Sequence, residues 1–182
     1  RVERLMREHK LVPHMVRRLH GTTQRTPTHA KSPNLLEQHF VATAPNQVWL
    51  TDTTELRSQE GVRYLATVED LCSRRIVGWA MADRMDTELV EKAWKMAVKQ
   101  RRPPIQLLHH TDRGSQYTSE NYLQLLEKAH CKMSMSRTGN CYDNAVIESF
   151  HATLKGECAY KPFETKAIAR TAIFEFIEDD EL

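Results

Sequence analysis

Residues 47–56, QVWLTDTTEL, determine which fold this chain can adopt. The stretch is rich in β-branched and aromatic residues, which favour a strand, and it carries Asp52 near its middle. Two more β-rich stretches, 62–70 and 75–82, follow closely enough to pair as antiparallel neighbours. The globular part of the chain is therefore expected to begin with three consecutive strands.

Helices and strands alternate beyond residue 82. A helix is expected to open at Asp86 or Thr87 and to stop before Pro103, because proline disfavours helical backbone in the residue before it. The apolar face of this helix consists of Leu89, Val90, Ala93, Trp94 and Ala97. The remaining expectations are a buried strand at 105–109, a helix at 120–129 with Ser119 as N-cap, a strand at 132–136, a mobile loop at 137–143, and helices at 144–158 and 165–178. This order predicts an α/β domain with a mixed sheet flanked by helices.

Composition limits the class of protein. The chain has 182 residues, 40% hydrophobic and 27% charged, which suits one globular domain with a short appendage. No apolar run approaches the roughly 18 residues of a membrane span, so no membrane contact is predicted. The four cysteines are scattered, which favours reduced thiols in a cytoplasmic protein: Cys72, Cys131, Cys141 and Cys158.

Residues 1–33 form a basic N-terminal segment, with eight Lys and Arg against two acidic residues. Helical spacing over 1–20, broken at Pro13, is followed by a linker rich in Thr, Pro and Lys. Charge alone leaves two interpretations open: an arm that attaches the chain to DNA, and a solvated terminus. Residues 34–182 are expected to form the globular core.

Three acidic residues stand at positions suited to chemistry. Asp52 lies within a strand, Asp112 lies just past a strand end, and Glu148 lies on the polar side of a helix. Each alone is more often structural, but a buried carboxylate must face solvent, pair with a cation or bind metal. Together they are the hard oxygen ligands that Mg²⁺ or Mn²⁺ prefers, and two such ions can support phosphoryl transfer. No Ser-His or Cys-His pair and no glycine-rich phosphate loop competes with this hypothesis.

Four motifs carry a resemblance to a known family: residues 49–54, 109–117, 136–150 and 154–157. With 59 residues between Asp52 and Asp112, and 35 between Asp112 and Glu148, they resemble the transposases of bacterial insertion sequences. The catalytic core of those enzymes is like retroviral integrase, within the ribonuclease-H-like superfamily. The likeness runs from about Leu35 to Ile177 and implies a ribonuclease-H-like, mixed five-stranded sheet.

The resemblance also implies a function. Asp52, Asp112 and Glu148 would bind two Mg²⁺ or Mn²⁺ ions and catalyse DNA strand cleavage and strand transfer. The partners would be DNA, both element ends and target, and further copies of the chain assembled on that DNA in the bacterial cytoplasm, at the nucleoid. The candidate DNA contacts are Lys155, Asn144, Arg137 and Gln116.

Several neighbouring residues have structural interpretations. Asp143 is the expected N-cap of the helix that carries Glu148, while Asn144 is open between capping and contacting DNA. His109 and His110 are expected to be structural, Trp49 and Trp79 to be core aromatics, and Tyr117 to be packed or to touch DNA.

Two departures from the family pattern shape the expectations for the termini. The N-terminal histidines have no cysteine companions before Cys72, so no zinc is predicted. Residues 1–33 resemble the end of a helix-turn-helix region plus a linker, and the acidic ending 178–182 suggests a truncated core. Two alternatives therefore stay open: a nuclease that only hydrolyses, and an inactive remnant that serves as a DNA-binding or oligomerisation module.

Overall fold

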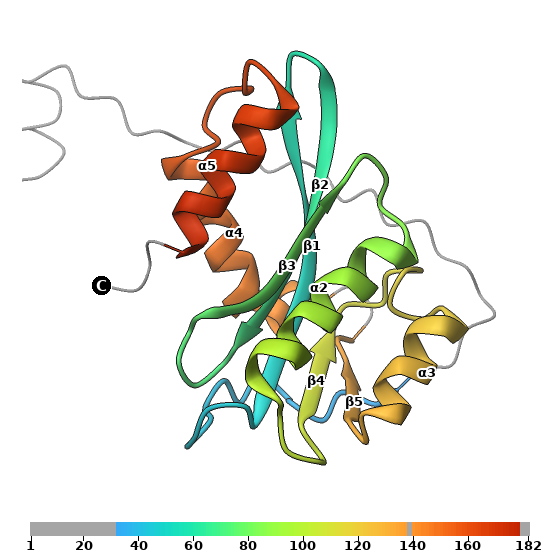
Figure 1. The fold of residues 1–182 in the computed structure, drawn as a ribbon. Coiled ribbons are helices and arrows are strands. Elements are labelled where there is room, and N and C mark those ends of the chain that lie inside the picture. Colours follow the sequence, from blue (N-terminus) through green and yellow to red (C-terminus); the bar gives the residue numbers. More distant parts are fainter. Residues whose placement is uncertain (1–31, 138–139, 179–182) are drawn as a thin grey trace, which may run out of the picture.

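The computed structural model describes residues 32–137 and 140–178, which are built around a single mixed sheet (Figure 1). The strand order is β3-β2-β1-β4-β5. The strands are β1 Val48–Ser58, β2 Gly61–Asp70, β3 Ile76–Ala82, β4 Leu108–Thr111 and β5 Lys132–Met135. β1 pairs antiparallel with β2, and β2 with β3, whereas β4 runs parallel to both β1 and β5. The predicted five-stranded mixed sheet is confirmed.

The helices connect and cover these strands. They are α2 Thr87–Arg101, α3 Glu120–Lys128, the 3₁₀ helix η1 Cys141–Asn144, α4 Ala145–Glu157 and α5 Lys166–Glu178. α2 begins as predicted, because the Asp86 carboxylate accepts a hydrogen bond from Leu89 N at 3.0 Å. It ends at Arg102, whose backbone is left-handed with φ of 46°, immediately before Pro103.

Hydrophobic cores lie on both sides of the sheet. On one side, Trp49, Ala66 and Val68 pack against α2 and α3. On the other, Leu56 and Leu65 pack against α4 and α5. Figure 1 shows the same separation, with α2 crossing one face and α4 and α5 lying at the other. The apolar face predicted for α2 is confirmed, since all five of its residues are buried.

The close fit of β3 to α2 depends on Gly78. A β-carbon at this position would lie 2.4 Å from Ala93 O and 2.6 Å from Ala97 N, both backbone atoms of α2. Glycine therefore lets this helix approach the sheet more closely than any other residue would.

Two expectations about local structure are wrong. The strand predicted at 105–109 begins only at Leu108, because Ile105 is 71% exposed and Gln106 turns the chain with φ of 69°. The segment predicted as a mobile loop contains η1 over 141–144. The predicted N-cap position of Ser119 in α3 is confirmed, although its hydroxyl donates to Gln116 O and makes no capping hydrogen bond.

Some expectations lie outside the described residues, among them the N-terminal helix over 1–20, the linker up to residue 31 and the acidic ending. The division into a basic segment and a core therefore stays a prediction. None of the described helices is long and apolar enough to cross a bilayer. Cys72, Cys131 and Cys158 carry free thiols.

Candidate active site

Asp52 and Asp112 lie on neighbouring parallel strands at the same level of the sheet. Thr51 of β1 pairs with Thr111 of β4, so the next residue on each chain segment is one of the two acids. Because adjacent strands lie about 4.8 Å apart, this register places the two carboxylates side by side. The first two acids predicted from the sequence are thus brought together by strand pairing.

Burial and charge act together on Asp112. Burial, the negative charge of Asp52 and, more weakly, that of Glu148 raise the pKa of the Asp112 carboxyl from 3.8 to about 6. A hydrogen bond that Gly114 N donates to Asp112 Oδ1 at 2.9 Å opposes this rise but does not cancel it. The repulsion shows that the three acids share one electrostatic environment.

Glu148 occupies the first turn of α4 and is exposed, as its position on the polar side of the helix predicts. The helix is anchored to the sheet by Ile147 and Leu154, which are fully buried. The Glu148 side chain is therefore more exposed than that of Asp112. The triad combines two acids carried by the sheet strands and their ends with one acid on the helix that covers the sheet.

Within residues 32–137 and 140–178, no group of three or more His, Cys, Asp or Glu side chains is arranged to hold a metal ion. The predicted triad is therefore not a closed ligand set in this structure. Its donor chemistry nevertheless fits a divalent cation: two carboxylates are held side by side, and their mutual repulsion is what a bound cation would relieve.

Lys155 lies two helical turns after Glu148 and is half-buried near Asp52 and Glu55. Burial lowers the pKa of its amine, while the charges of Glu55 and Asp52 raise it. A positive charge is thus held at the edge of the acidic pair.

A compact layer of polar and aromatic residues lies beside the acids. Gln116 is buried, and its Nε2 donates to Thr53 Oγ1 at 3.4 Å. Tyr117 is fully buried, as the packing interpretation predicted, and burial together with the charges of Asp52 and Asp112 raises the pKa of its phenol.

Asp143 is not the N-cap of α4, which corrects that prediction. Its buried carboxylate accepts hydrogen bonds from Arg137 N at 2.7 Å, from the Arg137 guanidinium at 3.0 and 3.1 Å, and from Gln38 Nε2 at 2.8 Å. The Arg137 guanidinium and the other hydrogen bonds hold the pKa of this carboxyl well below its usual range. Asp143 therefore fixes the segment that leads into α4.

Asn144 and Arg137 have structural surroundings that bear on their predicted DNA contacts. Asn144 stands at the N-cap position of α4 but makes no capping hydrogen bond, and its buried Oδ1 has no partner. The capping interpretation is therefore wrong, and the DNA contact stays a prediction. Arg137 pairs with Asp143 through one edge of its guanidinium, yet 57% of its side chain is exposed.

His109 and His110 are structural, as predicted. His109 Nε2 lies 2.7 Å from Tyr122 Oη, and burial lowers the pKa of its ring to about 3. His110 Nδ1 lies 2.8 Å from Ser134 Oγ, and its Nε2 lies 2.9 Å from Asp143 O. Both rings link β4 to its surroundings. Trp49 is buried in the core as predicted, whereas Trp79 is only half-buried.

Sequence reasoning missed His151. The ring is buried in α4, with Nδ1 3.5 Å from Asp52 Oδ2 and Nε2 2.8 Å from Thr67 Oγ1. One signal was available, because His151 follows Glu148 by three residues and so lies on a neighbouring face of the same helix.

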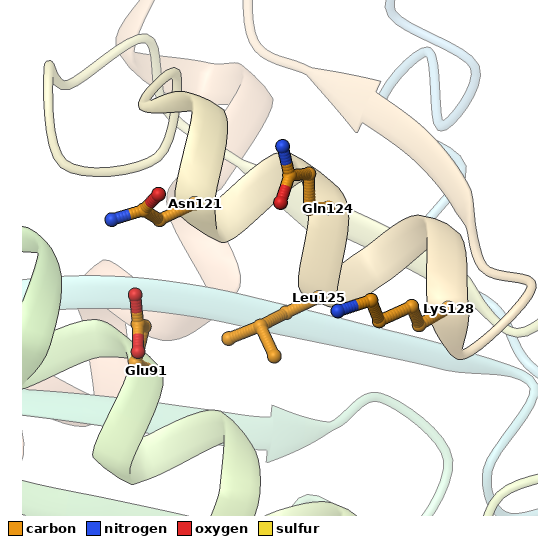
Figure 2. Close-up of a pocket in the computed structure, with 5 residues that line it drawn as sticks. All are labelled: Glu91, Asn121, Gln124, Leu125 and Lys128. Carbon is orange, nitrogen blue, oxygen red and sulfur yellow. The ribbon is translucent and has the colours of Figure 1, made fainter.

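One pocket of the described residues lies away from the acids. A shallow pocket of about 240 Å³ opens between α2 and α3 and is lined by Glu91, Asn121, Gln124, Leu125 and Lys128 (Figure 2). Figure 2 shows mainly polar side chains around it, and none of the three acids contributes.

Comparisons with known proteins agree with this geometry. A family model described as "Integrase core domain" matches residues 42–141, and a second model with the same description matches 129–179. The matched residues include Asp52, Asp112 and Glu148.

Two curated relatives match at high identity. "Insertion element IS600 uncharacterized 31 kDa protein" of Shigella sonnei is 45% identical over 98% of this chain and 66% of its own length. "Transposase for insertion sequence element IS904" of Lactococcus lactis is 49% identical over 80% of this chain and 58% of its own length. The chain thus spans less than two thirds of each relative.

The fold recurs in a solved viral protein. The HTLV-2 integrase catalytic core domain in complex with magnesium superposes with a TM-score of 0.57 at 16% identity. The match covers 74% of this chain and 87% of that one. The predicted ribonuclease-H-like architecture is confirmed by this likeness of fold.

Proposed function

Because this chain belongs to the integrase core domain family, we propose that it cuts DNA and joins DNA ends to a target. Asp52, Asp112 and Glu148 are the proposed catalytic residues. The observation that carries the proposal is the pairing of Thr51 with Thr111, which places the next residues, Asp52 and Asp112, side by side.

The three acids are also the proposed ligands of divalent metal. Mg²⁺ or Mn²⁺, bound as two ions, would supply activation of the attacking hydroxyl and stabilisation of the leaving oxygen. The chain's own contribution is to hold the carboxylates close and ionised when a cation is present. The HTLV-2 integrase core was solved with magnesium, which supports the choice of metal.

The other residues at the site would bind and orient DNA. Lys155 places a positive charge at the rim of the acidic pair, where a phosphodiester must approach. The exposed part of Arg137 and the amides of Gln116 and Asn144 are candidates for further contacts with the sugar-phosphate backbone. Because a single site acts on one strand at a time, two DNA ends would require at least two copies of the chain.

The test is a joining reaction. Labelled duplex oligonucleotide with a free 3′-hydroxyl is incubated with supercoiled plasmid and Mn²⁺, and covalent transfer of label to the plasmid is measured. The proposal predicts joined products with the wild type and none with Asp52→Asn, Asp112→Asn or Glu148→Gln. The matched control is Glu157→Gln, an exposed acid on the same helix, which should join normally.

Different products separate the proposal from its alternatives. Nicked or shortened DNA without joined product would indicate a nuclease that only hydrolyses. DNA binding without either product would indicate a remnant that binds without catalysis. Joining that survives Asp112→Asn would refute the assignment of the acids.

A further inference from the structure

His151 connects the helix that carries Glu148 to the strand that carries Asp52. It lies in α4, and only 6% of the residue is exposed. Its neighbours are polar on both edges of the ring: Thr67 Oγ1 lies 2.8 Å from Nε2, and Asp52 Oδ2 lies 3.5 Å from Nδ1. Buried ring nitrogens need polar partners, and here one of the two partners is the candidate catalytic carboxylate itself.

The sheet register explains why both partners face the same ring. Thr67 of β2 is the residue directly opposite Asp52 of β1. Side chains that are paired across antiparallel strands point to the same face of a sheet. Here that face is the one covered by α4, so the His151 ring lies over both Asp52 and Thr67.

The ring orientation follows from hydrogen-bonding capacity. A carboxylate oxygen accepts hydrogen bonds, so a proton on His151 Nδ1 would be directed at Asp52 Oδ2. In that tautomer the other nitrogen would accept from the Thr67 hydroxyl, which can donate as well as accept. Thr67 thereby satisfies the second ring nitrogen and fixes the orientation of the ring toward Asp52.

Asp52 is held from two sides as a result. Its Oδ1 accepts a hydrogen bond from Thr53 N at 2.7 Å, and its Oδ2 faces His151. Both contacts restrict rotation of the carboxylate. The same imidazole belongs to α4, the helix that also carries Glu148 and Lys155.

We propose that His151, oriented by Thr67, is a positioning residue that aligns the Asp52 carboxylate for metal binding and ties α4 to β1. This inference rests on the proposed function, since it assigns His151 a role in the same site. It adds two residues, His151 and Thr67, to the machinery of that site without placing either in contact with substrate.

The experiment compares Thr67→Val and His151→Leu with a matched control. Thr67→Val preserves shape and removes only the hydroxyl. Thr51→Val makes the same change at a buried threonine of β1, one residue before Asp52 and so on the opposite face of the sheet. His151→Asn retains a donor near the position of Nδ1 and tests rescue. For each variant, Mn²⁺ binding to the whole chain is measured by calorimetry without DNA, and joining is measured as a function of Mg²⁺ concentration.

The expected result is a loss of metal affinity that follows the polar contacts. His151→Leu should weaken Mn²⁺ binding about tenfold or more and raise the Mg²⁺ concentration for half-maximal joining to match, since residues that orient metal ligands have effects of about 10–100-fold. Thr67→Val should shift both in the same direction by a smaller factor, and His151→Asn should recover part of the loss. Thr51→Val should leave both unchanged.

Wild-type Mn²⁺ affinity in Thr67→Val and in folded His151→Leu would overturn the inference. If His151→Leu does not fold, the Thr67→Val and Thr51→Val pair decides alone. A chain that binds Mn²⁺ and shows these shifts without joining DNA would refute the proposed function and keep the inference. A chain that joins DNA but shows no change in metal affinity in these variants would support the proposed function and refute the inference about His151.

Discussion

Replacing Asp112 by asparagine should make the metal-free protein more stable while removing its activity. The substitution keeps the size of the side chain and an oxygen to accept the hydrogen bond from Gly114 N. It removes a partly buried negative charge that is repelled by Asp52 and Glu148. A residue that serves catalysis often lowers the stability of the fold, so replacing it stabilises the protein and removes its activity.

The magnitude follows from the raised pKa. Burial and the charge of Asp52 raise the pKa of the Asp112 carboxyl from its ordinary value of 3.8 to about 6, and each pKa unit corresponds to about 1.4 kcal/mol. After a discount for the partial exposure of the side chain, the charged form costs about 1–2 kcal/mol. For a chain of this length, that is a rise of roughly 3–6 °C in melting temperature.

The sign of the pH dependence is fixed by the direction of the shift. The folded state binds this proton more tightly than the unfolded chain, so the free energy of unfolding of the wild type falls as pH rises from about 4 to about 6. Asparagine does not titrate. The advantage of Asp112→Asn should therefore be small near pH 4 and complete above pH 6.

The assay is thermal unfolding of wild type and Asp112→Asn in chelator, at pH 4.5 and pH 7.5. Glu164→Gln serves as control because Glu164 is an exposed acid away from the site, and its melting temperature should match the wild type. Adding Mg²⁺ at pH 7.5 should raise the melting temperature of the wild type more than that of Asp112→Asn. An Asp112→Asn protein that melts below the wild type at pH 7.5 would refute the electrostatic reasoning.

Three further predictions concern the framework. Burial raises the pKa of the Glu69 carboxyl to about 7, so the free energy of unfolding of the wild type should fall by about 2–3 kcal/mol as pH rises from 4.5 to 7. Glu69→Gln cannot titrate and should not show this fall. If urea unfolding gives the same pH profile for both proteins, the prediction is contradicted. Gly78→Ala should cost about 3 kcal/mol or more in the same assay, because the new methyl group meets the backbone at Ala93, and near-wild-type stability would show that α2 can shift. Asp143→Ala should cost about 1–3 kcal/mol by leaving Arg137 N without its acceptor, and should slow joining by loosening the entry to α4; full activity would show that this anchor is dispensable.

Local patterns predicted much of the fold, because they depend on nearby residues. The α2 face followed from helical spacing, and its limits followed from Asp86 and Pro103. The first three strands followed from β-rich composition and short connections. The strand at 105–109 was placed too early, because the apolar Ile105 follows two prolines and lies exposed in the turn before β4.

Residues whose roles depend on distant partners escaped prediction. Asp143 looked like a cap because it stands just before a helix, but its partner Gln38 is 105 residues away in the chain. His151 gained its significance only when β2 placed Thr67 opposite Asp52. Asp52 and Asp112 were predictable as candidates, whereas their adjacency required the parallel pairing of β1 with β4.

The central claim is that Asp52, Asp112 and Glu148 bind a shared divalent metal, and titration with Mn²⁺ followed by electron paramagnetic resonance tests it most directly. The wild type should bind Mn²⁺, up to two ions when DNA is present. Asp52→Asn and Asp112→Asn should each abolish tight binding, and Glu148→Gln should weaken it, while Glu157→Gln should bind like the wild type. Equal Mn²⁺ binding by the wild type and by all three site variants would contradict the claim.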